Sequence, residues 1–82
     1  LDALRLRRAE ALRRVAVYEL TGLPQAAVIE RLSTRGFRAG ETGYAEYLLS
    51  LDRARRLRLD YVDALLVLNQ LSIEIDYLLG AE

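Results

Sequence analysis

The sequence predicts an all-α protein: an antiparallel helical hairpin of the coiled-coil type. Helix-favouring residues dominate, and 52% of the 82 residues are hydrophobic. The residues that interrupt helices fall in two places only, at 21–24 and at 36–43. The second half repeats apolar residues every three or four positions, which is the period of a coiled coil and not of a strand. A chain of this length forms one small domain, or a segment of a larger protein.

The first helix is expected over about residues 2–38, with a break near 21–24. Pro24 suits the first turn of a new helix, because its missing N–H has no helical partner there. The alternative is a continuous helix that Pro24 kinks. Cations crowd the start of this helix, where they oppose the helix macrodipole: Arg5, Arg7, Arg8, Arg13 and Arg14. We therefore expect the helix to continue upstream in a longer protein, or these arginines to form a solvated basic face.

The turn between the helices is expected at residues 39–43, within the stretch RGFRAGETGYAEY. Gly40 is free to adopt positive φ and close the first helix, and Thr42 is a candidate N-cap for the second. Folding the chain here opposes residues whose numbers sum to about 82, with Glu19 meeting Asp63 as a like-charge exception. Opposite charges are matched in the pairs Arg31–Asp52, Glu30–Arg53, Arg8–Glu74 and Arg7–Asp76.

The second helix is expected over about residues 44–79, with Gly80 as its C-terminal stop. Two overlapping stripes share its apolar face. The first stripe is Tyr47, Leu51, Ala54, Arg58, Tyr61, Leu65, Leu68, Ser72, Ile75 and Leu79, and the second is Ala54, Leu57, Tyr61, Ala64, Leu68, Leu71, Ile75 and Leu78. Val62, Leu66, Val67 and Ile73 widen the apolar surface further. One partner helix covers about one such seam, so we expect self-association, as a dimer forming a four-helix bundle or within a larger α-barrel.

The composition argues against an enzyme and against a metal or cofactor site. The chain contains no Cys, His or Met, which excludes disulfides and removes the usual ligands of zinc, copper and iron. Ser33, Ser50 and Ser72 have no histidine to act as a base, and no glycine-rich phosphate loop is present.

Charge and hydropathy exclude two further classes of partner. Twelve basic residues balance twelve acidic ones, so the net charge favours neither nucleic acid nor an anionic membrane. The arginines at 53–58 are flanked by Asp52 and Asp60, and aromatic interleaving is slight. The most apolar run, 61–79, contains Asp63, Glu74 and Asp76, and charges of this kind exclude direct membrane insertion.

Residues 18–80 carry short motifs in a defined order. They are Leu23-Pro24, Gly40-Glu41, Tyr44-Ala45-Glu46-Tyr47-Leu48, Tyr61 to Leu65, Asn69-Gln70 and Glu74 to Gly80. In this order and spacing the chain resembles the C-terminal periplasmic hairpin of TolC-like outer-membrane efflux channels, in their heavy-metal cation-efflux branch. The resemblance implies a periplasmic segment of a channel in which three subunits form a long α-barrel. It implies two partners, a periplasmic adaptor and an inner-membrane cation pump, the latter separate or fused to the channel.

The resemblance also implies candidate site residues. It places Ala39, Gly40, Glu41 and Thr42 at the tip that faces the adaptor. Glu46 falls where relatives have an acidic residue near the closed periplasmic aperture, where symmetry-related carboxylates would repel one another and attract cations. The alternative for Glu46 is an ordinary first-turn acid, favoured by the helix dipole. A second acidic position of some relatives, three residues later, is occupied here by leucine, which weakens an electrostatic gate.

Two alternatives remain open at this stage. The chain is also consistent with a soluble helical-bundle dimerisation module that has no role in transport, and flanking sequence would distinguish the two.

Tyr44, Tyr47, Tyr61 and Tyr77 lie at helical spacings. We interpret them as packing residues with solvated hydroxyls, the alternative being a ligand cage.

Overall fold

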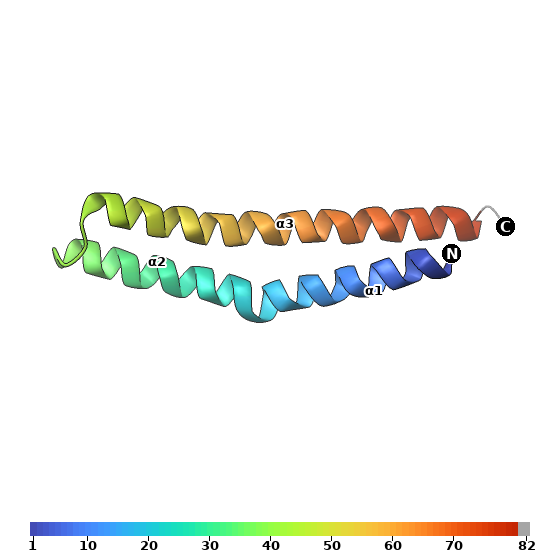
Figure 1. Ribbon diagram of the computed structural model, residues 1–82, viewed down its shortest axis with the longest axis horizontal. Helices are drawn as coiled ribbons and strands as arrows, with labels where there is room; N and C mark the ends of the chain where they lie inside the picture. Colours follow the sequence, from blue (N-terminus) through green and yellow to red (C-terminus); the bar gives the residue numbers. More distant parts are fainter. Residues whose placement is uncertain (81–82) are drawn as a thin grey trace.

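The computed structural model describes residues 1–80, which form a long helical hairpin (Figure 1). Its elements are α1 (Asp2–Val17), the π-helical segment η1 (Tyr18–Gly22), α2 (Leu23–Arg38) and α3 (Tyr44–Gly80). The first three form one arm and α3 forms the other, and the start of α1 lies beside the end of α3, opposite the turn. The molecule measures 63 × 17 × 14 Å. The predicted all-α antiparallel hairpin is confirmed, and its association into a bundle or barrel stays a prediction.

The first arm is continuous where the sequence predicted a break. The amide of Leu23 donates to the carbonyl of Tyr18, five residues back, which is the hydrogen bond of a π-helix. Pro24 follows in the first turn of α2 and has no N–H to donate. The hydroxyl of Thr21 donates to the carbonyl of Val17 at 2.6 Å. The arm therefore bends at a π-bulge, and Figure 1 shows it bowing away from α3 at this point.

Small side chains form the seam between the two arms. The buried hydrophobic residues are Ala11, Val15, Ala26, Ala54, Ala64 and Ile75, and Gly22 and Gly36 are buried with them. Ala26 and Ala54 are both 0% exposed. The distance between packed helices depends on the side chains at their contact, so the alanines allow the arms to lie close together. The two buried glycines lie against Tyr18 and Thr42 instead. The second predicted stripe of α3 follows this seam and contains all three of its buried residues.

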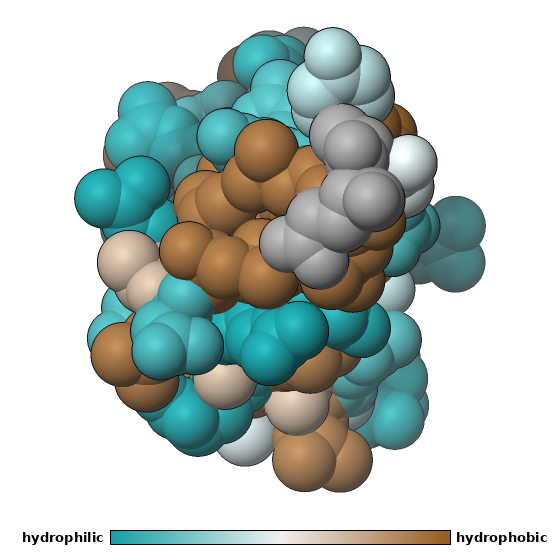
Figure 2. Space-filling view, turned by 90° about the vertical axis from the view of Figure 1, so that its right-hand side faces the viewer, coloured by the Kyte–Doolittle hydropathy of each residue, from teal (hydrophilic) through white to brown (hydrophobic). Residues whose placement is uncertain are grey.

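A seam of small residues leaves many large apolar side chains uncovered. The four residues predicted to widen the apolar surface of α3 are exposed by between 47% and 68%: Val62, Leu66, Val67 and Ile73. Figure 2 looks at the open end of the hairpin, where hydrophobic surface gathers over the last turns of α3. Leu78 and Leu79 are part-exposed there. Whether α3 stops at Gly80, as predicted, lies outside the described residues.

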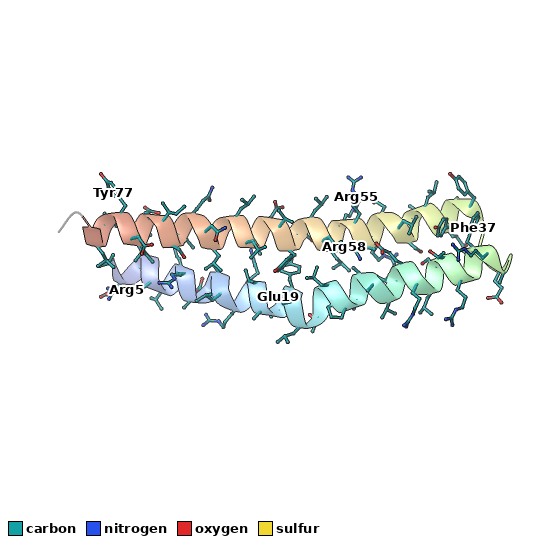
Figure 3. All side chains as sticks on the ribbon, turned by 180° about the vertical axis from the view of Figure 1, so that it is seen from behind. Arg5, Glu19, Phe37, Arg55, Arg58 and Tyr77 are labelled. Carbon is teal, nitrogen blue, oxygen red and sulfur yellow. The ribbon has the colours of Figure 1, made fainter. Side chains whose placement is uncertain are left out.

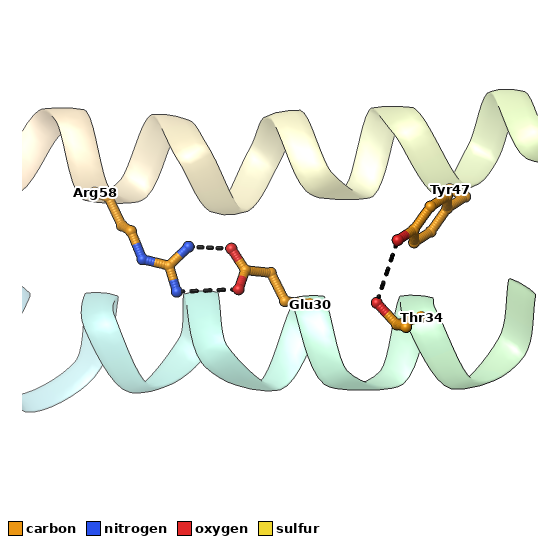
Figure 4. Close-up of polar contacts among 4 residues, drawn as sticks. All are labelled: Glu30, Thr34, Tyr47 and Arg58. Atoms are coloured by element: carbon orange, nitrogen blue, oxygen red, sulfur yellow. Dashed lines mark hydrogen bonds and ion pairs between the residues drawn. The ribbon is translucent and has the colours of Figure 1, made fainter. Parts of the chain in front are cut away.

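The predicted charge pairing between the arms is wrong in detail. Among residues 1–80, none of the four predicted pairs comes within 4 Å, and Glu30 pairs with Arg58 instead (Figure 4). The fold axis itself is close to the expected one, because Thr34 contacts Tyr47 and Glu19 contacts Tyr61, pairs whose numbers sum to about 80. Long flexible side chains reach along the helix to different partners, so the register fixes which turns face each other but not which charges meet.

We expect the substitution Ala26→Leu to destabilise the hairpin by about 1–3 kcal/mol, because a larger side chain has no room in the seam. The matched control is Ala27→Leu, at the exposed neighbouring position, which should change stability by no more than about 0.5 kcal/mol. Urea denaturation at one protein concentration measures both variants. Equal stability of the two would contradict close packing at Ala26.

Candidate functional site

The closed end of the hairpin is a compact turn that ends α2 and exposes the predicted tip residues. Gly40 has a φ of +76°, in the left-handed region that glycine adopts without strain. Its amide donates to the carbonyl of Phe37 at 3.1 Å, and the amide of Glu41 donates to the carbonyl of Gly36 at 2.9 Å. This pair of hydrogen bonds is a Schellman motif, which satisfies carbonyls left free at the helix end.

All four predicted tip residues lie in this one turn. Ala39, Gly40 and Glu41 are exposed, and Thr42 is half-buried. The amide of Thr42 also donates to the carbonyl of Gly36, at 3.2 Å. The backbone of the turn is therefore fixed by hydrogen bonds, while the side chain of Glu41 is free to meet another molecule.

Thr42 packs back onto α2 and does not cap α3, so that prediction is wrong. A Cβ atom at Gly36 would lie 2.6 Å from the Thr42 hydroxyl oxygen, which shows how closely the two residues approach. The first helical hydrogen bond of α3 runs from the amide of Tyr47 to the carbonyl of Gly43, at 3.0 Å. Gly43 is therefore the N-cap residue, and Glu46 is the third residue of the helix.

This position explains Glu46 without reference to any aperture. An acidic side chain in the first turn lies near the positive end of the helix dipole, and the third helical position is where capping boxes carry glutamate. Glu46 is exposed on the side of the second arm just behind the tip. The structure thus supplies a local reason for an acid here, and a role at an aperture stays a prediction.

Three aromatic rings fasten the two arms together directly behind the turn. Phe37 stacks on Tyr47 with ring centroids 4.5 Å apart and planes 4° apart, and it meets Tyr44 at 5.9 Å in a tilted arrangement. The hydroxyl of Tyr47 lies 3.4 Å from that of Thr34 on α2 (Figure 4). Figure 3 shows Phe37 at the closed end, between the arms. The interpretation of Tyr47 as a packing residue agrees with this geometry, and the sequence analysis missed its partner Phe37.

A basic groove adjoins the tip on α2. Its lining includes Arg31, Arg35 and Arg38, which recur at spacings of four and three and so share one face of the helix. The tip therefore presents an acidic side chain, Glu41, beside an arginine-rich groove. The sequence analysis did not single out this groove, although the helical spacing of the three arginines is a signal for it.

Polar contacts fix the arms at two further points along the seam. The guanidinium of Arg58 makes a forked contact with the carboxylate of Glu30, and Figure 3 shows Arg58 directed toward the first arm. Beside the π-bulge, the hydroxyl of Tyr61 donates to Glu19 Oε2 at 3.1 Å. Partial burial, the hydrogen bond to Glu19 and the negative charge of Glu19 all raise the pKa of Tyr61 above its ordinary value of 10.0.

No three acidic residues within 1–80 lie close enough together to hold a metal ion. Nor is any helix in this part of the chain both long and apolar enough to cross a bilayer. What the tip can provide is a rigid surface of defined shape and charge.

Comparison with known proteins adds no family to this description. No family model, no curated protein and no solved structure matches the chain.

We expect Gly43→Ser to stabilise the hairpin by roughly 0.3 kcal/mol relative to glycine and by about 1 kcal/mol relative to alanine at this position, because a serine hydroxyl at the N-cap accepts a hydrogen bond from an amide of the first turn. A Cβ atom at Gly43 meets nothing within 4 Å, and the residue does not have positive φ. The matched control, Gly43→Ala, fills the same space without the hydroxyl and should not stabilise. Thermal unfolding followed by circular dichroism compares the two. A gain in both variants would rule out capping as its cause.

We expect Glu19→Gln to lower the pKa of Tyr61 toward 10.0, since the substitution removes the charge that disfavours the phenolate. Partial burial is the largest cause of the raised pKa, followed by the hydrogen bond and the charge of Glu19, and all three favour the neutral phenol in the folded state. The corresponding stability is present below pH ~10 and is lost as the pH rises through the folded-state pKa. Carbon-13 NMR titration of the tyrosine ring signals measures the pKa. The control Glu10→Gln, on α1, should leave it unchanged, and a wild-type value of 10.0 would contradict the contact.

Proposed function

We propose that this chain is a periplasmic coiled-coil segment of a TolC-like outer-membrane channel, in a tripartite system that exports heavy-metal cations. The segment forms part of the conduit wall, and its turn docks on the periplasmic adaptor. The observation that carries the proposal is the exposed, rigid tip at the end of a 63 Å hairpin. The ordered motifs that resemble the channel family lie on both sides of this tip.

The construction of the tip supports docking. Ala39, Gly40 and Glu41 are exposed, yet the backbone beneath them is fixed by the Schellman hydrogen bonds and by the stacked rings of Phe37 and Tyr47. A surface that is already ordered loses little conformational entropy on binding. The negative charge of Glu41 lies beside the positive charges of the arginine groove. This asymmetry of charge favours one orientation of a partner on the surface.

The lateral faces support a place in a wall of helices. Leu20 on η1 and Ile73 on α3 are 77% and 68% exposed, so large apolar side chains point outward on both arms. In a barrel of three subunits, neighbouring helices cover such residues. The role is structural: the segment performs no chemistry, and selectivity for the ion belongs to the inner-membrane pump.

A second candidate function is a soluble helical-bundle dimerisation module. The uncovered apolar residues of α3, among them Leu66, favour it as strongly as they favour a barrel wall, because any apolar helix can cover them. The tip distinguishes the two functions, since a dimerisation module has no need of an ordered surface at 39–42.

The test uses the gene that encodes this chain in its source organism. We expect its reading frame to contain amphipathic segments of about ten alternating residues, as in outer-membrane β-barrels, and its product to fractionate with the outer membrane. A Glu41→Arg substitution should sensitise cells to zinc, cobalt, cadmium, copper or silver salts as strongly as deletion of the gene does.

The matched control is Glu10→Arg, which makes the same charge change at an exposed position on α1, far from the tip. It should leave metal tolerance and protein abundance unchanged. A reading frame without such segments, together with a product outside the envelope, would overturn the channel role and leave the dimerisation module. A Glu41→Arg strain as tolerant as wild type would overturn docking through the tip.

A further inference from the structure

The face of α3 that points away from the first arm carries a further apolar stripe, which no part of the described chain covers. This outer stripe consists of Leu59, Val62, Leu66, Asn69 and Ile73, which recur at spacings of three and four. Its four apolar members are exposed by between 48% and 68%. Leu66 follows the buried Ala64 by two residues, or about 200° around the helix, so the outer stripe faces away from the seam.

The outer stripe has the pattern of a coiled-coil contact. Apolar residues at alternating spacings of three and four are the positions that insert into a facing helix. A single polar residue, Asn69, interrupts the stripe, and one such residue restricts register at a cost in stability. The outer face of the first arm is a poorer contact, because Arg13 lies midway between the exposed Leu6 and Leu20 at spacings of seven.

The charges at the two ends of the outer stripe have opposite sign. Arg53, Arg55 and Arg56 lie before it and are exposed, and Glu74 and Asp76 lie at its far end and are also exposed. Arg56 is paired with Asp52 at 3.0 Å and Asp60 lies nearby, so Arg53 and Arg55 carry the excess positive charge at the first end. Figure 3 shows Arg55 pointing away from the first arm. After Arg58, which contacts Glu30, the described part of α3 contains no further basic residue. The helix is therefore basic at one end of the stripe and acidic at the other.

This distribution of charge favours a second copy of the chain as the partner and an antiparallel orientation of the two helices. Two copies of α3 placed antiparallel about Leu66 bring Arg55 of each opposite Asp76 of the other, since the two residues lie about equally far from Leu66. A parallel pair would instead set arginines against arginines and acids against acids, which is repulsive. The antiparallel arrangement is two-fold symmetric, so one patch serves both copies and the assembly closes at two.

We propose that the outer stripe binds a second copy of this chain, with α3 against α3, antiparallel and centred on Leu66. The product is a four-helix assembly in which the two copies of α3 form the centre and the two first arms lie outside. The turns of the two hairpins then point in opposite directions. This inference concerns the 82-residue chain itself and does not depend on the proposed channel role.

Sedimentation equilibrium at micromolar concentration tests the association. The chain should sediment as a dimer, and Leu66→Glu should raise the dissociation constant about tenfold or more, because it buries a charge at the centre of the contact. The matched control is Leu20→Glu, at a position 77% exposed on η1, which should leave the dissociation constant unchanged. Circular dichroism establishes that both variants keep their helix content. A monomer, a trimer, or equal weakening by both substitutions would overturn the proposal.

Cross-linking tests the direction, since the chain has no native cysteine. A short bis-maleimide should link two copies of the Leu66→Cys variant but not two copies of the Ile73→Cys variant, whose thiols lie about 20 Å apart along the axis in the antiparallel pair. An equal mixture of the Leu59→Cys and Ile73→Cys variants should cross-link to each other. Efficient linking of the Ile73→Cys variant to itself would show a parallel pair and overturn the proposal.

Discussion

The two arms of this hairpin pack against each other mainly through alanine, and the other features of the structure follow from that close contact. Ala26 and Ala54 are completely buried, and the buried residues include only two with larger side chains, Val15 and Ile75. Such a seam holds the arms together through many short contacts. It cannot also enclose the numerous leucines of the chain, because there is no space between the helices for them. The uncovered apolar surface on both arms is thus a consequence of how the arms pack.

Small residues also determine the packing at the closed end of the hairpin. Gly36 admits the Thr42 side chain at a distance that no Cβ atom would tolerate, and Gly40 supplies the positive φ that reverses the chain. These two glycines bring the ends of α2 and α3 close enough for Phe37 to stack on Tyr47. The result is a turn that is ordered from within, so its exposed side chains need no partner to become ordered. The order of the tip therefore follows from local backbone hydrogen bonds and ring stacking.

The structure defines the shape of this chain and the placement of its charges. Polar contacts of Glu30 with Arg58 and of Glu19 with Tyr61 connect the two arms at two points. The π-bulge lets the first arm bow while remaining helical through Pro24. A rigid rod with a defined tip and uncovered flanks is suited to assembly with other helices, whether those belong to a channel wall or to a second copy of the chain.

The pattern of residue types along the chain is sufficient to predict the hairpin. Gly40 marks the turn because only its conformational freedom permits the reversal, and the spacing from Ala54 to Ile75 identifies the face of α3 that packs. The tertiary structure alone decided the details that depend on contacts across the seam. The sequence allows Thr42 to cap α3, but its side chain packs over Gly36 on α2 instead, because glycine leaves space there. Glu30 contacts Arg58 because both side chains are long enough to meet across the seam. The π-bulge could not be predicted from the sequence either. A proline predicts that one backbone hydrogen bond is missing, but not which hydrogen bonds the neighbouring residues form instead.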